Sequence, residues 1–451
     1  MLLGVVAVLA AYGYRATSRE RQYRDEIARG ESAMARDDTG GAVAAFTSAL
    51  ALRPGSMLGY LRRGEAYRRQ NDLESALRDL RRATELDPTS PRAFELFADV
   101  NYALGRYERA AERYQDSVRL DDRSARVQYK LALSRYRTRQ IAAAITALES
   151  TIALDDRLAE AHYLLGLCYR DLQKPAESIA ALERSLALAP ALIGAREELA
   201  DLLGRLGRSE DRIEQLQSLL GIDPGSSREV ALGLAYASAG RADSAVMTLR
   251  RAAQRHPQQT RPYVALGRVW LETGLQRGDR VDLAKALEAL RGAAGSDRSS
   301  ETLTLYGRAL LAAGEEEEAL RTFQEAVAQL PVDATAFFFL ADLAERRGDR
   351  ELARSALIDY QALDGEGLDD RRRAALSARI GDLSLRLGDL PSAVSSYQRA
   401  ADAEPSAAAL VRLADAQLRA RDLEAARATV VRVLEKDPDN RAAQALRFKL
   451  R

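Results

Sequence analysis

The side chains best suited to catalysis or metal binding stand apart from one another in this sequence. The chain has two histidines, His162 and His256, and one cysteine, Cys168. A nucleophilic or metal site needs several such groups at a defined spacing, and neither histidine has a cysteine, a serine or a second histidine at that spacing. His162 occupies a helical packing position, which is typical of a structural histidine. Cys168 is interpreted as a small buried apolar group.

A run of four glutamates, Glu315–Glu318, is the other feature that could supply acid–base groups. It lies at the start of an expected helix, where negative charge complements the helix dipole, so we interpret it as a solvated helix start. Glycine-rich phosphate loops are also missing from the sequence, because no G-x-G spacing opens a helix after a strand. We therefore predict that the chain is not an enzyme and has no catalytic residue, no cofactor-binding residue and no metal ligand.

The stretch from Met57 to Ser90 shows which elements position the side chains. Small or apolar residues recur at helical spacing in both halves of the stretch; they are Tyr60, Gly64, Tyr67, Ala76, Leu80 and Ala83. Asn71-Asp72 interrupts the pattern, and Asp87-Pro88 ends it because proline cannot continue a helix. The stretch therefore predicts two short amphipathic helices joined by a tight turn.

The same pattern recurs along the whole chain. Positions spaced by about 34 residues, counted from Gly64 in both directions, are all glycine or alanine. The series is Gly30, Gly64, Ala98, Ala132, Gly166, Ala200, Gly233, Gly267, Gly307, Ala341, Gly381 and Ala414. Only small side chains let two helix backbones approach closely, so one packing geometry is being reused. Most prolines share a single phase just past the second helix; they are Pro54, Pro88, Pro190, Pro224, Pro257, Pro331, Pro405 and Pro438.

This unit resembles the tetratricopeptide repeat (TPR), a helix–turn–helix motif of 34 residues. The resemblance rests on the small residue at position eight of the unit and on alanines at positions twenty and twenty-seven, as in Gly64, Ala76 and Ala83. It implies an all-α, right-handed superhelical α-solenoid of about 12 repeats, each stabilised by stacking on its neighbours. The expected repeats are 23–56, 57–90, 91–124, 125–158, 159–192, 193–225, 226–259, 260–299, 300–333, 334–367, 374–406 and 407–440.

The expected solenoid covers residues 23–440, with a linker before it (15–22) and a C-terminal capping helix after it (441–451). Two insertions interrupt the repeat. Extra residues near 275–281 are expected to lengthen a turn, and further residues near 364–373 separate two repeats. Insertions in repeat arrays map to loops and often to a binding edge, although a lengthened helix or a flexible break is the simpler interpretation.

Residues 1–14 are uncharged and apolar, and arginines follow at once, at Arg15, Arg19, Arg21 and Arg24. A membrane anchor explains this pattern best, although a helix of 14 residues reaches only about 21 Å of the ~30 Å hydrocarbon core. A signal peptide, a hydrophobic first helix packed on the first repeat, and a truncated start are the alternatives. The arginines favour a solenoid on the cytoplasmic face, and an exported, periplasmic protein is the alternative.

The resemblance also implies where a partner would bind, because the first helices of such repeats line a concave groove. In the third to fifth repeats the groove-facing positions combine tyrosines and leucines with flanking arginines; the predicted partner-binding residues are Arg92, Tyr102, Arg126, Tyr129, Leu133, Tyr136, Tyr163, Leu167 and Arg170. Tyrosine and arginine commonly anchor protein interfaces. The opposing interpretation is that these tyrosines only pack between adjacent first helices. In a later repeat, Phe338 has a groove-facing position, and Phe337 and Phe339 are expected in the core.

Two classes of partner are disfavoured. The net charge of +1 argues against nucleic acid, which needs a strongly basic surface. Members of the family that hold chaperone tails use lysine and asparagine at the fifth and ninth positions, and here those positions carry other residues, namely Leu61/Glu65, Glu95/Asp99, Tyr129/Leu133 and Tyr163/Leu167.

We therefore predict a membrane-anchored scaffold or adaptor that binds a peptide or helical segment of a protein partner in its groove, with no nucleic acid and no small-molecule substrate. Analogy with bacterial members of the family suggests assembly or quality control of envelope machinery. The alternatives are a regulatory or substrate-docking subunit of a separately encoded enzyme, and an exported envelope-assembly protein.

Overall fold

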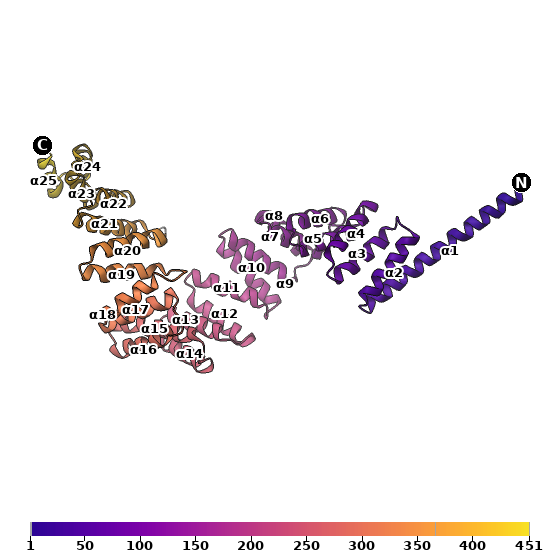
Figure 1. The fold of residues 1–451 in the computed structure, drawn as a ribbon, viewed down its shortest axis with the longest axis horizontal. Coiled ribbons are helices and arrows are strands. Elements are labelled where there is room, and N and C mark those ends of the chain that lie inside the picture. Colours follow the sequence, from indigo (N-terminus) through magenta and orange to yellow (C-terminus); the bar gives the residue numbers. More distant parts are fainter. Residues whose placement is uncertain (1, 366, 451) are drawn as a thin grey trace. The chain divides into compact units, whose positions relative to one another are not determined.

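The computed structural model describes residues 2–365 and 367–450, with side chains from residue 17 onward. The described residues form α-helices joined by short turns, without a β-strand. By its contacts the chain divides into two units, Met1–Ile222 and Asp223–Arg451, each a stack of helices in which consecutive elements pack as pairs (Figure 1). The prediction of an all-α solenoid is confirmed.

The helices of the first unit are α1 (Leu2–Ala35), α2 (Thr39–Leu52), α3 (Met57–Arg69), α4 (Leu73–Leu86), α5 (Pro91–Ala103), α6 (Tyr107–Leu120), α7 (Ala125–Arg137), α8 (Ile141–Leu154), α9 (Ala159–Asp171), α10 (Pro175–Leu188), α11 (Ile193–Arg205) and α12 (Ser209–Ile222). Those of the second unit are α13 (Ser226–Ser238), α14 (Ala242–Arg255), α15 (Thr260–Arg277), α16 (Arg280–Ala294), α17 (Ser300–Ala313), α18 (Glu316–Ala326), α19 (Ala334–Arg346), α20 (Arg350–Asp364), α21 (Asp370–Arg386), α22 (Leu390–Ala403), α23 (Ala407–Arg419), α24 (Leu423–Lys436) and α25 (Arg441–Lys449).

The turn predicted at Asn71-Asp72 shows how each helix pair is made. Asn71 adopts the left-handed conformation, with φ of 62°, which reverses the chain after α3. The Asp72 side chain then accepts a hydrogen bond from the backbone N–H of Ser75 at 3.1 Å and so caps α4. Ser56 caps α3 in the same way, through the N–H of Gly59 at 3.0 Å. Local sequence therefore sets both ends of the pair.

The small residues of the 34-residue series lie where two helices touch. A Cβ atom built on Gly64 of α3 would lie 2.7 Å from Cγ of Leu80 on α4. The same contact joins Gly166 to Leu182 at 2.8 Å. Leu80 and Leu182 are both almost fully buried. The prediction that small residues permit close helix approach is confirmed at these positions.

We expect Gly64→Val to destabilise the first unit by about 1–2 kcal/mol, because the added methyl groups would displace the buried Leu80. Gly55→Val is the matched control, since no atom lies within 4 Å of a Cβ at that position. Thermal and urea unfolding followed by circular dichroism measure the difference. Equal midpoints for the two variants would show that the close approach does not matter for stability.

The N-terminal region departs from the prediction. Residues 15–22 were expected to form a linker, but they continue α1, so that prediction is wrong. The C-terminal part of α1 packs on α2 through Tyr23, Ile27 and Ala33, which are buried against Phe46. The first repeat therefore begins inside a longer helix.

None of the described helices combines the length and the apolar composition needed to cross a membrane. Met1 and the side chains of residues 2–16 lie outside the described part of the chain. The interpretations of residues 1–14 as an anchor, a signal peptide or a packed helix therefore stay predictions.

The first insertion lengthens a helix and not a turn. α15 continues to Arg277, Gly278 ends it in the left-handed conformation with φ of 66°, and Asp279 caps α16 through the N–H groups of Val281 and Asp282. The prediction of a longer turn at residues 275–281 is thus wrong. Part of the second insertion likewise extends the ends of α20 and α21. At the C-terminus, α25 buries Ala443 and Leu446, the latter in a cluster with residues of α24.

Candidate partner-binding surface

The predicted groove residues lie on three first helices, α5, α7 and α9, that follow one another in the first unit. Ser90 and Ser124 cap α5 and α7 by accepting hydrogen bonds from Ala93 and Val127, so the starts of these two helices are fixed by their own sequence. Within the first unit the helices alternate as pairs (Figure 1), and the tyrosines predicted to bind a partner lie on first helices.

The structure brings the predicted aromatic and aliphatic residues together as one half-buried surface. This surface, called the tyrosine face below, consists of Tyr102, Tyr129, Leu133, Tyr136, Tyr163 and Leu167. Five of the six pack against the hydrophobic cluster of α5 to α10, and Tyr163 packs against a second cluster, of α10 and α11. Tyr163 reaches α11, where a Cβ at Gly194 would lie 2.9 Å from its hydroxyl oxygen.

Tyr129 lies at the centre of this surface. Burial raises the pKa of its hydroxyl above the ordinary value, and nearby Glu160, Tyr102 and Tyr163 raise it further. These neighbours come from α5 and α9, on either side of α7, so the tyrosines of three successive repeats lie near one another. Each of them keeps part of its ring buried and part accessible, which is compatible both with packing and with partner binding.

The arginines predicted to flank the groove are held by an ion-pair network. Arg92 and Arg126 both contact the buried Glu95, at 2.8 and 2.9 Å. Lys130 bridges Glu95 and Asp99, at 2.9 and 2.8 Å. Burial alone would raise the pKa of Glu95, but the hydrogen bonds from Lys130 and Arg92 outweigh burial and hold that pKa below its ordinary value. Glu95 is therefore ionised and links α5 to α7.

Lys130 is a residue that sequence reasoning missed. Its partners Glu95 and Asp99 lie one repeat earlier, on α5, and Asp99 also accepts a hydrogen bond from the Tyr114 hydroxyl at 2.6 Å. The sequence could have indicated this contact, because Lys130 follows the two acidic residues by about one repeat length. Successive repeats stack with corresponding residues side by side. The network joins the third repeat to the fourth, on the same helices as the tyrosine face.

Arg170 performs a similar role one repeat further along. Its guanidinium donates to Glu198 of α11 at 2.6 Å, to Asp171 at 2.8 Å and to the Tyr136 hydroxyl of α7 at 3.2 Å. One side chain therefore connects three successive first helices. The position of Tyr136 on the tyrosine face is fixed by this contact.

The histidines and the cysteine, which could in principle take part in catalysis, lie where they have structural roles. His162 is buried, and its Nε2 lies 3.0 Å from the carbonyl oxygen of Asp156. His256 ends α14 in the other unit. Burial raises the pKa of the Cys168 thiol to about 12, which keeps it protonated and unreactive near neutral pH. The structural interpretations of His162 and Cys168 are confirmed.

The glutamate run also forms a helix start, as expected. Glu315 precedes α18 and the next three glutamates form its exposed first turn. Arg347 contacts Glu317 at 2.8 Å, and the Tyr306 hydroxyl donates to Glu318 at 2.6 Å. Among the described residues, no group of three or more acidic, histidine or cysteine side chains is arranged to hold a metal ion.

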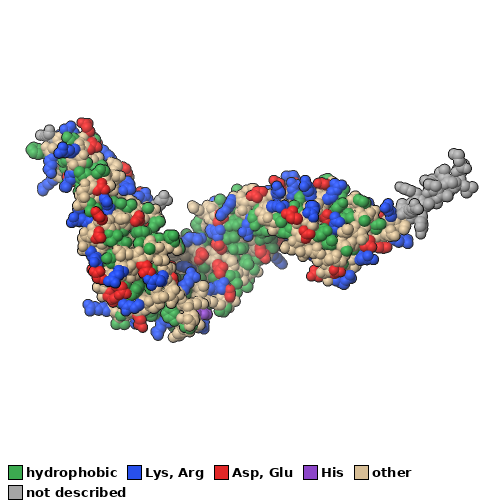
Figure 2. Space-filling view, viewed as in Figure 1, with side chains coloured by type: hydrophobic (Ala, Val, Ile, Leu, Met, Phe, Trp, Pro, Cys, Tyr) green, Lys and Arg blue, Asp and Glu red, His purple; other side chains and the backbone are tan. Residues whose placement is uncertain are grey.

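In the second unit, Phe338 of α19 is 37% exposed, whereas Phe337 and Phe339 pack against the hydrophobic core, as predicted. The guanidinium of Arg379 lies 5.7 Å from the centre of the Phe338 ring. Positive and negative side chains both occur over the face of the molecule that Figure 2 shows.

Comparison with known proteins identifies the repeats. A family model described as tetratricopeptide repeat matches residues 27–91, 61–125, 95–156, 129–193 and 379–441, and a second model of the same description matches residues 230–366. Comparison with curated protein sequences gives no match.

Similar solved structures include the C-terminal part of a TPR repeat-containing protein from Cytophaga hutchinsonii, at 16% identity and a TM-score of 0.47 over 52% of this chain and 98% of that one. Pseudomonas aeruginosa PilF is 22% identical, with a TM-score of 0.38 over 46% and 94% of the two chains. YrrB, described as a TPR protein with an unusual peptide-binding site, is 20% identical, with a TM-score of 0.38 over 42% and 96%. TPR proteins generally act as non-enzymatic scaffolds in protein–protein interactions. Because the family models match repeatedly along both units and the helix pairs have the expected geometry, this chain belongs to the tetratricopeptide repeat family.

Proposed function

We propose that this protein is a membrane-anchored adaptor that binds a segment of a partner protein on the tyrosine face. The observation that carries the proposal is that partly exposed tyrosines from three successive first helices lie near one another. Tyrosine offers a large, rigid contact area with a polar tip, so it binds partner segments at a small entropic cost.

The ion pairs between the helices of the tyrosine face support the proposal. Glu95, Lys130 and Arg170 fix α5, α7 and α9 relative to one another before any partner arrives. A surface ordered in advance loses less conformational entropy on binding, which strengthens association. Because Arg92 and Arg126 already pair with Glu95, affinity is expected to come mainly from the tyrosines and leucines and less from free arginines.

Cross-linking mass spectrometry in the native host tests this proposal. Cross-links to one partner are expected to concentrate at Lys130 and Glu160, beside the tyrosine face. Few are expected at Lys174, which lies in the turn before α10. Links spread evenly over these sites, or no links to another protein, would contradict the proposal. A transferase or protease recovered in the same molar amount as this chain would identify the chain as a docking subunit of that enzyme.

We propose further that residues 1–14 attach the protein to a membrane, with the solenoid on the cytoplasmic face. The uncharged apolar run and the arginines that follow it support this proposal.

Deletion of residues 2–14 is expected to move the protein from the membrane fraction to the supernatant after alkaline extraction of native cells. Val6→Arg is expected to have the same effect, because one arginine at the centre of an apolar segment costs about 3 kcal/mol on insertion scales. Ala153→Arg, which adds the same charge at an exposed position of α8, is the control and should leave the protein in the membrane fraction. A truncated protein that stays with the membrane would contradict the anchor.

A further inference from the structure

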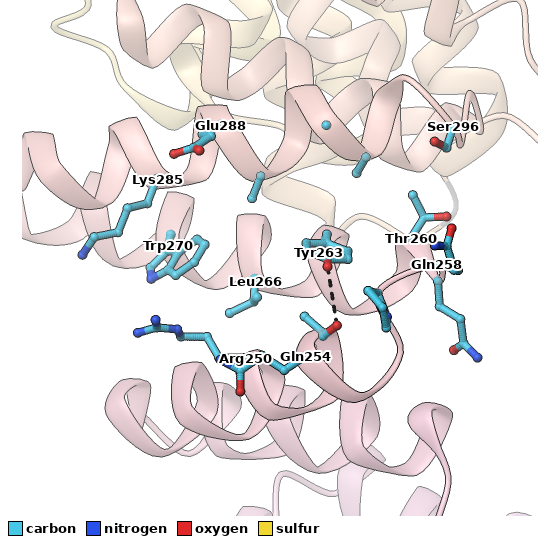
Figure 3. A pocket seen from close by; sticks show the side chains of 16 residues that line it. Arg250, Gln254, Gln258, Thr260, Tyr263, Leu266, Trp270, Lys285, Glu288 and Ser296 are labelled. Atoms are coloured by element: carbon cyan, nitrogen blue, oxygen red, sulfur yellow. Dashed lines mark hydrogen bonds between the residues drawn. The ribbon is translucent and has the colours of Figure 1, made fainter.

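An open groove lies between two second helices of the second unit, α14 and α16, with α15 as its floor (Figure 3). It has a volume of about 650 Å³, and a hollow of about 570 Å³ adjoins it. The two share four lining residues, Arg250, Gln254, Trp270 and Lys285. This size is typical of a ligand-binding pocket.

The groove is open because its walls carry small side chains. Ala253 of α14 faces Ala289, Gly292 and Ala293 of α16. A Cβ built on Gly292 would meet no atom within 4 Å. The space is therefore preformed, and a side chain of a partner could enter it without moving the residues that line the groove.

The floor supplies aromatic and apolar contacts. Trp270, the one tryptophan of the sequence, is half-buried there, and Leu266 and Tyr263 continue the floor along α15. The Tyr263 hydroxyl is held by the carbonyl oxygen of Ala253 at 3.5 Å. Met247 lies at the rim and is 69% exposed. Tryptophan and tyrosine in a concave site are the side chains that most often anchor a bound peptide.

The charge differs between the two ends of the groove. Figure 3 shows Arg250, Trp270, Lys285 and the carboxylate of Glu288 toward one end, and Gln258, Thr260 and Ser296, which are uncharged, at the other. This charged end also includes Arg251 and Arg277, together with the carboxylates of Asp243 and Asp282, so its four cations outnumber its three carboxylates.

Two of these cations are available to a ligand. Lys285 is paired with Asp282 at 3.0 Å, and Arg251 approaches Glu229 at 3.6 Å. Within the described part of the chain, neither Arg250 nor Arg277 forms an ion pair. Arg277 belongs to the residues that lengthen α15, so the insertion in the eighth repeat supplies a charge to this groove.

We propose that this groove is a second docking site, which binds an acidic peptide segment of a partner protein. A carboxylate of the peptide pairs with Arg250 and Arg277, and a neighbouring aromatic or aliphatic side chain packs on Trp270 and Leu266. Paired cations beside an aromatic floor match an acidic segment with an apolar anchor, as in other arginine-based recognition of acidic motifs. The site lies in the other unit from the tyrosine face, so it does not depend on the function proposed above.

Fluorescence of Trp270 in the full-length protein tests this proposal, because no other tryptophan contributes to the signal. The probe is a capped nine-residue peptide with a central Phe-Leu pair flanked by glutamates, compared with versions carrying glutamine or lysine in place of glutamate. The acidic peptide is expected to shift the emission saturably, and to bind at least about tenfold more tightly than the lysine version. Equal binding of the three peptides, or no saturable shift, would overturn the proposal.

Three variants make the test specific. Arg250→Met is expected to weaken binding of the acidic peptide about tenfold. Gly292→Phe is expected to fill the groove and abolish binding while the helix content stays unchanged. Arg321→Met, which removes an exposed arginine from α18, is the control and should bind like the wild type. A peptide-free dimer that Gly292→Phe dissociates would overturn the proposal in favour of a second copy of the chain as the occupant.

Discussion

Replacing both Tyr129 and Tyr163 by serine is expected to reduce partner recovery from native cells by more than about 100-fold. Each truncation removes a large part of an aromatic contact surface at the centre of the tyrosine face. Interface tyrosines of this kind contribute about 2 kcal/mol or more each, which is a factor of roughly 30 in affinity per residue. The measurement is co-purification with quantitative mass spectrometry, comparing variant and wild type at equal expression.

Tyr169→Ser is the matched control for loss of packing. Tyr169 also packs against the hydrophobic cluster of α5 to α10, but its acidic neighbours Glu149 and Glu177 belong to the second helices α8 and α10. The control should therefore show the structural cost of losing a half-buried tyrosine without affecting the partner. If the control and the double variant lose the partner equally, the tyrosine face would be a packing feature and not a binding site.

Replacing Lys130 by methionine is expected to destabilise the first unit by about 2–3 kcal/mol. The change keeps the length of the side chain but leaves Glu95 and Asp99 without their shared cation, and Glu95 is 4% exposed. Removing one partner of a buried ion pair is costly because the remaining charge stays in a poorly solvated place. Arg92 and Arg126 still contact Glu95, which keeps the effect below the largest known for such changes.

The ionisation of Glu95 should also make the stability of the folded protein depend on pH. The pKa of Glu95 is lower in the folded protein than in the unfolded chain, so its ionisation stabilises the fold above a pH of about 4 and that stabilisation is lost as the pH falls further. Urea unfolding of the wild type should show this loss, and Lys130→Met should show less of it. Lys174→Met, in an exposed turn, is the control. A Lys130→Met variant as stable as the control would contradict the structural role of the network.

The sequence predicted the repeating parts of this structure well, because each is set locally. Gly64 and Leu80 must meet wherever helices pair at this spacing, and Asn71-Asp72 encodes its own turn. The linker prediction at residues 15–22 was wrong because a change from apolar to charged residues was taken as a boundary. That segment contains no glycine or proline to end the helix. In the eighth repeat, Gly278-Asp279 gave the true turn through a left-handed cap and a helix N-cap.

The parts that sequence reasoning missed depend on distances between repeats. Lys130 meets Glu95 and Asp99 across the stack, which follows from how two repeats are rotated relative to each other and not from either helix alone. The groove over Trp270 arises where Ala253, Ala289 and Gly292 all fail to fill the same space. Such a coincidence of small residues on separate helices is visible only once the helices are placed.

Site-specific photo-cross-linking in native cells tests the central claim, that the tyrosine face binds a protein partner. A photoreactive amino acid at Leu133, which follows Tyr129 by about one helical turn on α7, is compared with the same group at Thr146, which is exposed on the second helix α8. We expect one dominant adduct from position 133 that is lost in the Tyr129→Ser, Tyr163→Ser background, and none from position 146. An adduct with the same protein from position 146 and none from position 133 would contradict it.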